Sequence, residues 1–324
     1  DPARMMLGQR ADQDAIDEIN RELGLDKSIL YQYALYLNDL SPVSYHSSNA
    51  LDGSFYEGSK YGGSTFFQAD AFSLVVKAPY LRKSYQSKKD VSSILFESLP
   101  ETAVLALASI AIASILGILL GVLSALYQDR WVDKILLLLA TSGMALPSFF
   151  VGIIFAWLFG YVWSDWTGLN MSGSLYEVDD LGRGEYVNWS NLVLPALTLG
   201  IRPLSVVLQL SRNSMLEVLS MDYVRTARAK GLTTRSTLFN HALKNALNPV
   251  VTTISGMFAS LMAGAVFFEI IFSWKGIGWE IVNALEKYDL PIVMGAVLII
   301  AVIFVVVNIL VDIFYGVLDP RVRV

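Results

Sequence analysis

Long apolar runs separated by polar segments fill the chain from residue 99 onward. Five of these runs are long enough, at about 1.5 Å per helical residue, to cross the roughly 30 Å of hydrocarbon in a bilayer. They cover residues 103–127, 135–163, 192–210, 249–272 and 291–318. Pro147 interrupts the second run and should bend its helix, because proline removes a backbone hydrogen bond. The pattern predicts an all-α protein that spans the membrane several times.

Residues 1–98 are polar and predict a separate region of mixed structure. Within residues 11–24, Ile16, Ile19 and Leu23 fall on one helical stripe and Gly24 follows as a common helix stop, so we expect a short amphipathic helix there. Residues 41–63 are rich in Ser, Gly, Asn and Tyr, a composition typical of loops or short strands at a surface.

The distribution of charge orients the chain, because positively charged residues favour the cytoplasmic side of a membrane. Three connecting segments that alternate onto one side carry Arg130, Lys134, Arg212, Arg225, Arg228, Lys230, Arg235, Lys244, Arg321 and Arg323. The connectors on the other side are acidic or balanced, with Asp165, Glu177, Asp179, Asp180, Arg183 and Glu185 in one and Lys275, Glu280, Glu286, Lys287 and Asp289 in the other. We therefore expect loop 212–248 and the C-terminus in the cytoplasm and residues 1–98 outside it. A chain that begins outside without a signal peptide also predicts a further span before Asp1.

Composition supports a membrane location and argues against chemistry by this chain. Hydrophobic residues make up 54% and charged residues 16% of the 324 residues, which is too apolar for an ordinary soluble domain. There is no cysteine and there are two histidines, so we expect neither a disulfide nor a metal site. The ATP-binding motif G-x-x-x-x-G-K-[ST] and the hydrolase motifs G-x-S-x-G and H-E-x-x-H are missing. We expect no enzyme activity and no cofactor bound by this chain.

A basic segment between the third and fourth apolar runs, residues 222–250, is longer than a connector requires. Apolar positions at helical spacing on both sides of Gly231 predict a helix, a turn and a second helix at the membrane surface. One interpretation is a basic hairpin that rests on anionic lipid. A nucleic-acid-binding role has less support, because no such fold surrounds the charges. The third interpretation is docking to a cytoplasmic partner, with Tyr223, Leu232 and Leu238 as buried contacts.

The run DYVRTARAKGLTTRSTLFNHALKNALNPVV resembles the cytoplasmic loop of the dipeptide/oligopeptide/nickel class of ABC importer permeases, which typically reads Y-I-R-T-A-R-A-K-G-L followed by H-A-L-R-N-A. The broader family has Glu-Ala-Ala followed by Gly at the places that Arg225, Thr226, Ala227 and Gly231 occupy here. The resemblance implies a coupling helix that fits a groove on an ATPase subunit. The residues that it assigns to this loop are Asp222, Tyr223, Arg225, Thr226, Ala227, Arg228, Lys230, Gly231 and Leu232.

Other parts of the chain resemble the same class, so that the resemblance covers nearly all of it. The matching runs are DPARMMLGQRAD at Asp1, LPETAVLALAS at Leu99, FFEIIFSWKGIG at Phe267 and GVLDPRVR at Gly316. Lys275 stands where the class usually has proline. Residues 41–80 are an insertion relative to the class, and one hypothesis is that they dock an external protein.

The resemblance implies a type I ABC importer permease fold in the cell inner membrane. It also implies a second homologous permease subunit, two cytoplasmic ATPase subunits that bind ATP and Mg, and an external solute-binding protein. Transport would proceed by alternating access, with di- or oligopeptides as the expected cargo. The alternatives are a secondary transporter or channel whose basic loop lies on lipid, and a membrane-embedded enzyme, which the missing motifs disfavour.

Three residues inside the apolar runs are candidates for the translocation path or gate. Arg202 lies near mid-span, where an ionised side chain is costly, so it should line a cavity or find a partner such as a salt bridge or a helix end. Glu269 could line the path, although a pair with Lys275 or a contact that structures the turn is favoured. Pro147 could serve gating or packing. Asn308 and Asp312 lie four residues apart, and packing against a neighbouring helix is the favoured interpretation.

Overall fold

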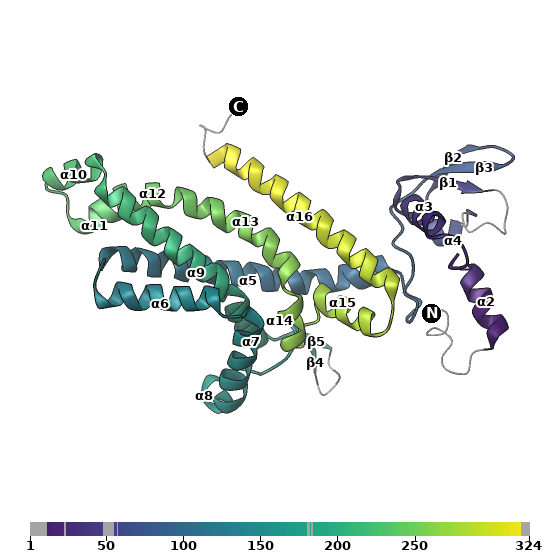
Figure 1. The fold of residues 1–324 in the computed structure, drawn as a ribbon, viewed down its shortest axis with the longest axis horizontal. Helices are drawn as coiled ribbons and strands as arrows, with labels where there is room; N and C mark the ends of the chain where they lie inside the picture. Colours follow the sequence, from purple (N-terminus) through teal and green to yellow (C-terminus); the bar gives the residue numbers. More distant parts are fainter. Residues whose placement is uncertain are drawn as a thin grey trace. The chain divides into compact units, whose positions relative to one another are not determined.

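The computed structural model describes residues 12–22, 24–47, 55–56, 58–179, 182 and 184–318. The chain divides into two compact units, which Figure 1 shows in the colours of the sequence. The first unit is Asp1–Glu97 with Glu280–Val297, and the second is Ser98–Trp279 with Leu298–Val324. Most of the N-terminal and C-terminal motifs, together with Leu23, Asp180, Arg183, Arg321 and Arg323, lie outside the described residues.

The first unit begins with two helices, α2 (Gln13–Glu22) and α3 (Ile29–Leu40). Gly24 follows α2 with a φ of +68°, in the left-handed region that glycine adopts without strain. The predicted short amphipathic helix is therefore confirmed. Ser28 caps α3, because its hydroxyl oxygen accepts a hydrogen bond from the backbone N–H of Tyr31 at 3.4 Å.

A small antiparallel sheet in the order β1-β3-β2 follows these helices. Its strands are β1 (Val43–Ser47), β2 (Ser64–Gln68) and β3 (Phe72–Val76), and the short helix α4 (Gly58–Tyr61) lies between the first two in sequence. Ser44 and His46 are buried, whereas Tyr45 and Phe67 on the other side of the sheet are exposed. Loops or short strands were expected between residues 41 and 63, and β1 is such a strand. That residues 41–80 are an insertion stays a prediction.

A buried carboxylate joins distant parts of the first unit. Asp289 is 2% exposed. Its oxygens accept hydrogen bonds from the Ser84 hydroxyl at 2.5 Å and from the backbone N–H groups of Tyr85 and Gln86 at 3.0 and 3.2 Å. The turn between α15 (Ile277–Glu286) and α16 (Leu290–Leu318) is thereby fixed to the loop that follows β3. Residues 280–297 belong to the first unit.

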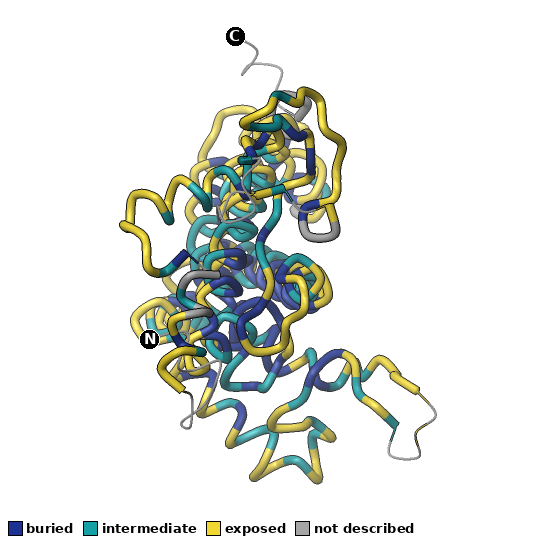
Figure 2. Tube along the Cα trace, turned by 90° about the vertical axis from the view of Figure 1, so that its right-hand side faces the viewer, coloured by how far each residue is buried: buried dark blue, intermediate teal, exposed yellow. Residues whose placement is uncertain are grey.

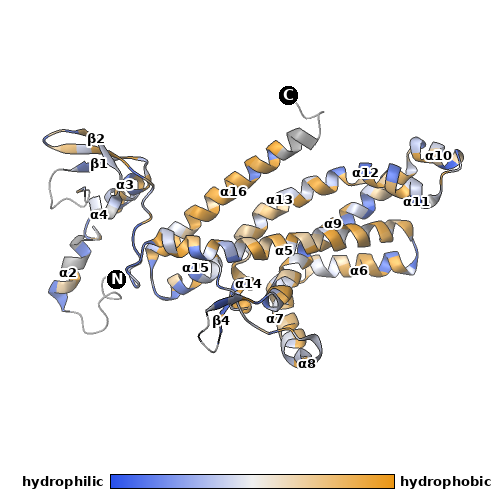
Figure 3. Cartoon of the chain, turned by 180° about the vertical axis from the view of Figure 1, so that it is seen from behind, coloured by the Kyte–Doolittle hydropathy of each residue, from blue (hydrophilic) through white to orange (hydrophobic). Residues whose placement is uncertain are grey.

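The second unit is helical, and its helices account for the apolar runs. In chain order these helices are most of α5 (Val91–Leu126), α6 (Trp131–Ala145), α7 (Ser148–Trp157), the π-helical turn η1 (Leu158–Val162), α8 (Ser164–Thr167), α9 (Ser190–Ser220), α10 (Asp222–Ala229), α11 (Thr234–Ser236), the π-helical turn η2 (Thr237–Ala242), α12 (Leu243–Ala246), α13 (Asn248–Gly264) and α14 (Val266–Ile271), with parts of α15 and α16. Orange, apolar residues predominate along α5, α6 and α16 in Figure 3. Among the described residues, three helices are long and apolar enough to cross a membrane, or up to five spans if each of two bent helix pairs counts as one.

The helix boundaries differ from the predicted apolar runs in two informative ways. The helix that contains the first run begins at Val91, because the amphipathic turns before residue 103 continue it without a break. The third run belongs to α9, a continuous helix from Ser190 to Ser220 despite Pro195 and Pro203. Both prolines are buried, and 61% of the most apolar stretch of α9 is buried compared with 28% for α16. Burial therefore makes α9 the central helix of this unit, and Figure 2 shows the buried segments in dark blue.

Close packing of α5 on α9 depends on small residues. A Cβ atom added at Gly121 would lie 2.6 Å from the carbonyl oxygen of Leu208 and 2.6 Å from the Cβ atom of Ser211. Such distances are shorter than any van der Waals contact. Only glycine allows the two helices to approach this closely, which is a common way for helices to associate inside a membrane.

A hairpin of two short strands precedes α9. Strand β4 (Tyr176–Val178) pairs antiparallel with β5 (Glu185–Val187). The Glu177 carboxylate accepts hydrogen bonds from the side-chain amides of Asn188 at 2.9 Å and Asn191 at 2.7 Å and from the Tyr186 hydroxyl at 3.0 Å. These donors, the amide of Asn188 first among them, and the nearby positive charge of Lys275 hold the pKa of Glu177 below its ordinary value.

Candidate docking surface and pathway residues

The basic segment folds directly onto the end of the central helix. α9 ends at Ser220 and α10 begins at Asp222, so that only Met221 lies between them, in an extended conformation. The carbonyl of Met221 accepts hydrogen bonds from the backbone N–H groups of Val224 at 3.1 Å and Arg225 at 3.3 Å. A change of direction within one residue leaves little freedom between the two helices. Figure 1 shows α10 and α11 at the end of the unit where α5 turns into α6.

One face of α10 is buried in a small apolar core. Val224 is 0% and Ala227 is 7% exposed. The core that contains Val224 also contains Ala125, Met215, Val218, Leu238, Ala242 and Ala246. Leu238 was expected to contact a partner, and this expectation is wrong, because the side chain is already buried inside the chain. Ala227, one of the residues assigned to the coupling loop, also faces inward.

The remaining residues assigned to the loop form an outward surface. We define the α10 surface as the exposed residues Asp222, Tyr223, Arg225, Thr226, Arg228, Lys230, Gly231 and Leu232. Arg225 lies 3.6 Å from Asp222, and both side chains are largely in solvent, so this ion pair leaves the surface basic and open. In Figure 3 the helix α10 includes blue, hydrophilic residues. Such a surface suits contact with another macromolecule.

The turn after α10 closes with glycine in the left-handed conformation. Gly231 has a φ of +84°. The backbone N–H of Leu232 donates to the carbonyl of Ala227 at 3.3 Å, and that of Gly231 donates to Arg228 at 3.0 Å. These two bonds are those of a Schellman cap, in which glycine follows the last helical residues. The predicted helix end and turn at Gly231 are confirmed.

Tyr223 ties α10 to the helix that leads back into the membrane segment. Its hydroxyl accepts a hydrogen bond from the side-chain amide of Asn245 at 2.8 Å and lies 3.5 Å from the carbonyl oxygen of His241, to which it donates. The Ser214 hydroxyl donates to the carbonyl of Ala246 at 2.8 Å. α10, α9 and α12 are therefore connected by polar bonds as well as by the apolar core.

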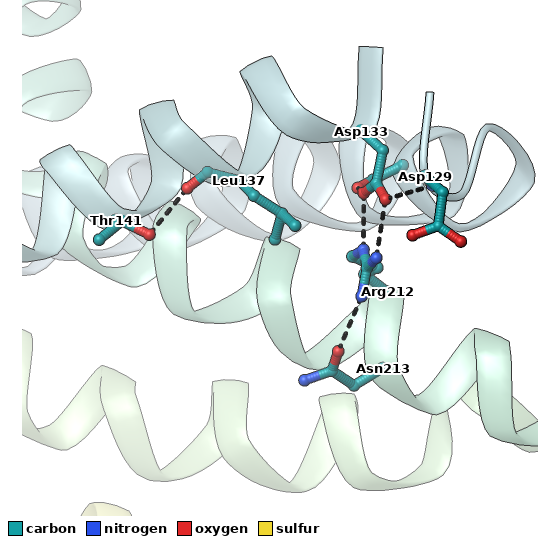
Figure 4. Close-up of polar contacts among 7 residues, drawn as sticks. Asp129, Asp133, Leu137, Thr141, Arg212 and Asn213 are labelled. Carbon is teal, nitrogen blue, oxygen red and sulfur yellow. Dashed lines mark hydrogen bonds and ion pairs between the residues drawn. The ribbon is translucent and has the colours of Figure 1, made fainter. Parts of the chain in front are cut away.

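An ion pair that the sequence did not reveal lies beside this core. Arg212 on α9 makes two hydrogen bonds to Asp133 at the start of α6, from Nε to Oδ1 and from Nη2 to Oδ2, each at 2.7 Å (Figure 4). Asp133 is 2% exposed. The expected orientation of the chain counted Arg212 among the positive charges of the cytoplasmic segments, although Asp133 compensates its charge within the chain. Because 79 residues separate the partners, no local signal could have indicated the pair.

Arg202 projects from the middle of α9. Its side chain is exposed, and no hydrogen bond or ion pair joins it to another residue in the described part of the chain. A salt bridge within the chain and a helix-end contact were possible explanations for this residue. No salt bridge of Arg202 is seen in the described residues, and no helix end lies there, because α9 continues without a break through Pro203 to Ser220. An ionisable side chain at mid-span needs water or a partner, and the role of Arg202 in the translocation path stays a prediction.

Pro147 bends the second predicted span sharply. α6 ends at Ala145, α7 begins at Ser148, and the two segments differ in direction by 107°. The missing N–H of proline explains why α6 cannot continue. The predicted bend at Pro147 is confirmed.

Glu269 is enclosed by the chain. It is 0% exposed, and its oxygens accept hydrogen bonds from the Thr102 hydroxyl at 2.7 Å and from the backbone N–H of Trp279 at 3.0 Å. The indole N–H of Trp274 donates to the carbonyl of Glu101 at 3.0 Å. The FSWKGIG segment is thus fixed to the α5 residues 101 and 102. These contacts fit the turn-structuring role of Glu269, and no ion pair with Lys275 is seen in the described residues.

Nothing in the described chain suggests bond-making chemistry. No group of three or more His, Cys, Asp or Glu side chains could hold a metal ion within the described ranges. The hydroxyl of Ser44 lies 2.8 Å from Nε2 of His46, but both residues are 0% exposed and no substrate could reach them. The α10 surface is an exposed basic patch connected directly to the central helix α9. This arrangement suits the transmission of movement rather than catalysis.

Comparison with known proteins identifies the family. Residues 117–324 match the family described as binding-protein-dependent transport system inner membrane component, and residues 1–50 match the N-terminal family of the same membrane components. The chain belongs to the binding-protein-dependent transport system inner membrane component family. It is therefore a permease subunit of an ABC importer, and it is not itself an enzyme.

Individual relatives support this family along nearly the whole chain. The dipeptide transport system permease protein DppB of Alkalihalophilus pseudofirmus is 30% identical over 99% of this chain and 90% of its own length. DppB of Haemophilus influenzae is 39% identical over 74% of this chain and 76% of its own length. The glutathione transport system permease protein GsiC of Escherichia coli K12 is 29% identical over 100% of this chain and 89% of its own length.

Solved structures support the fold of the permease. A chain of the MetNI methionine ABC transporter in an inward-facing conformation superposes with a TM-score of 0.54 at 14% sequence identity, covering 70% of this chain and 97% of that one. A chain of an amino acid ABC transporter with histidines gives a TM-score of 0.50 at 13% identity, covering 69% and 93%. The helical architecture is thus that of ABC importer membrane subunits.

Proposed function

We propose that this permease imports di- or oligopeptides as one half of a translocation path that it forms with a second, similar permease subunit. Two cytoplasmic ATPase subunits bind ATP and Mg, and an external solute-binding protein delivers the cargo. The α10 surface docks into a groove on one ATPase subunit. In this arrangement residues 1–98 and the hairpin β4–β5 lie outside the cytoplasm, whereas the α10 surface and the C-terminus lie inside it.

The observation that carries this proposal is the fixed connection between the α10 surface and α9. Docking can drive transport only if a displacement of the docked helix reaches the membrane. Here a single residue separates α10 from α9, an apolar core encloses Val224, and Tyr223 bonds to α12. ATP binding closes the ATPase pair, α10 moves with its groove, and the spans reorient toward the binding protein.

Arg228→Glu tests the docking role in the complex of permease, ATPase and binding protein. A reversed charge within the interface weakens docking, and we expect ATP hydrolysis stimulated by the binding protein to fall by about tenfold or more, which corresponds to roughly 1.4 kcal/mol. Lys244→Glu is the matched control, because Lys244 is exposed on α12 and lies outside the α10 surface. We expect stimulated hydrolysis close to the original rate in this control.

The alternative in which the basic loop rests on anionic lipid makes a different prediction. Both variants would then weaken membrane contact to a similar degree, and both would respond to the lipid charge of the nanodisc in which the complex is held. Equal rates of stimulated hydrolysis for Arg228→Glu and the unmodified complex would contradict docking through this surface. An unmodified permease that transports without any ATPase subunit would favour the secondary transporter.

The peptide cargo rests on the relatives, since DppB and GsiC are named for dipeptide and glutathione transport. Both cargoes are short peptides. We expect proteoliposomes that contain the complete importer to accumulate a labelled dipeptide or tripeptide when ATP is enclosed, and to take up no label when ATP is withheld. Mass spectrometry of the ligand that co-purifies with the binding protein checks this independently, and a non-peptide ligand there would contradict the assignment.

A further inference from the structure

The buried pair of Asp133 and Arg212 has no part in the contacts proposed for docking or for cargo. Its Nε–Oδ1 and Nη2–Oδ2 bonds of 2.7 Å align the planar guanidinium with the carboxylate, a geometry that lysine cannot reproduce. The Arg212 side chain is 14% and the Asp133 side chain 2% exposed. Solvent therefore screens this pair much less than a surface ion pair.

The carboxylate of Asp133 also collects donors from the preceding helix and turn. The Ser124 hydroxyl near the end of α5 donates to Oδ1 at 2.5 Å, and the backbone N–H of Asp129 donates to Oδ2 at 2.9 Å. Asp129 itself has a φ of +63°, so the turn holds a conformation that is unfavourable for most residues. One carboxylate thus joins the end of α5, the turn, the start of α6 and α9.

The position of Arg212 relates this junction to α10. Ser220, where α9 ends, lies eight positions after Arg212, which is about 12 Å along a helix. The apolar core beneath α10 includes Ala125 from α5 together with Met215 and Val218 from α9. The ion pair therefore lies at one edge of the core that holds the docking helix in place.

We propose that Asp133 and Arg212 are positioning residues that make the α5–α6 turn move as one body with α9 and α10. The inference rests on the proposed docking function, because it concerns how a displacement of α10 is distributed to the spans. Without the pair, α9 could follow the ATPase subunit while α5 and α6 lag behind. Less peptide would then be transported for each ATP hydrolysed.

Arg212→Lys tests this role while keeping the positive charge. In the reconstituted importer we expect ATPase subunits to co-purify in normal amount and ATP hydrolysis to continue, while peptide transported per ATP hydrolysed falls about fivefold, within the range by which single residues modulate coupling. Asp133→Asn should give a similar loss. Lys134→Gln is the matched control, since Lys134 neighbours Asp133 but is exposed, and its transport per ATP should equal that of the unmodified importer.

A distance measurement distinguishes positioning from general stabilisation. The chain contains no cysteine, so spin labels can be attached at Lys134→Cys on α6 and Ser220→Cys at the end of α9. We expect one narrow distance distribution with and without an ATP analogue, and a broad distribution when Arg212→Lys is added. Because the labels report on the permease alone, Arg212→Lys need not support transport for this comparison.

The outcomes separate the two proposals. Normal transport per ATP in Arg212→Lys, or a narrow label distribution in that variant, would overturn the positioning role and leave the docking function intact. A parallel loss of assembly, hydrolysis and transport would also overturn it, because that result describes a purely structural pair. Failure of the unmodified complex to import with ATP would overturn the docking function and this inference with it.

Discussion

At the scale of single residues, Gly231 determines where α10 ends. Its φ of +84° suits glycine, is tolerated by asparagine and is strongly unfavourable for a β-branched residue. No atom lies within 4 Å of a Cβ atom added there, so the cost of a substitution is conformational rather than steric. We expect Gly231→Val to destabilise the end of α10 by about 1–2 kcal/mol, and Gly231→Asn to cost much less.

Hydrogen exchange of the backbone amides in α10 checks this prediction. Faster exchange at Lys230, Gly231 and Leu232 in Gly231→Val, with near-original rates in Gly231→Asn, is the expected result. Equal exchange in both variants would show that the cap does not depend on glycine. Gly231 could be predicted from the sequence, because a glycine after a helical run is a local signal. Asp133 and Arg212 could not, since their pairing depends on how distant helices pack.

Glu177 predicts a pH dependence of the hairpin β4–β5. Its folded-state pKa lies below the ordinary value of 4.5, chiefly because Asn188 and Asn191 donate to its carboxylate. A lowered pKa contributes stability that is fully present above about pH 4.5 and is lost as the pH falls through the folded-state pKa. We expect amide protection in the hairpin to decrease below pH 4.5. The same pH profile in Glu177→Gln would contradict this assignment.

At the scale of helices, the α5–α9 contact is set by the absence of a side chain at Gly121. The Cβ atom of Gly121→Ala would lie 2.6 Å from the carbonyl oxygen of Leu208, so the helices must separate or bend. We expect a loss of about 1–3 kcal/mol, typical of overpacking. Gly256→Ala on α13 is the control, because open space surrounds its Cβ position.

The unfolding midpoint of the purified permease in detergent reports the stability of both glycine variants. A lower midpoint for Gly121→Ala only is expected, whereas equal midpoints would mean that α5 and α9 can adjust without cost. The sequence predicted these helices from their apolar runs. Arg202 and Pro203 interrupt the apolar run 192–210, but α9 is a single long helix that packs against α6, α7 and α13.

At the scale of the whole molecule, local patterns and resemblance predicted the helical architecture and the family. They did not predict the contacts between distant residues, because those contacts depend on packing. The FSWKGIG segment matched the family by sequence alone. Its structural role follows from the hydrogen bonds that the Thr102 hydroxyl and the backbone N–H of Trp279 donate to the Glu269 carboxylate. Similarly, the acidic connector that contains Asp289 indicated a side of the membrane, but not that Asp289 fixes the loop at Ser84.

The orientation of the chain in the membrane yields a direct test. Arg212 is neutralised by Asp133, but Arg225, Arg228, Lys230, Arg235 and Lys244 still make the α10 end more basic than the connectors around Glu177 and Glu286. Tyr45 in β1 and Lys244 in α12 are both exposed, and the chain has no cysteine of its own. We expect a membrane-impermeant maleimide to label Tyr45→Cys in intact cells stripped of any outer barrier, and to label Lys244→Cys only after the membrane is opened. Labelling of Lys244→Cys in intact cells would reverse the proposed topology, place the α10 surface away from ATP, and exclude docking to a cytoplasmic ATPase.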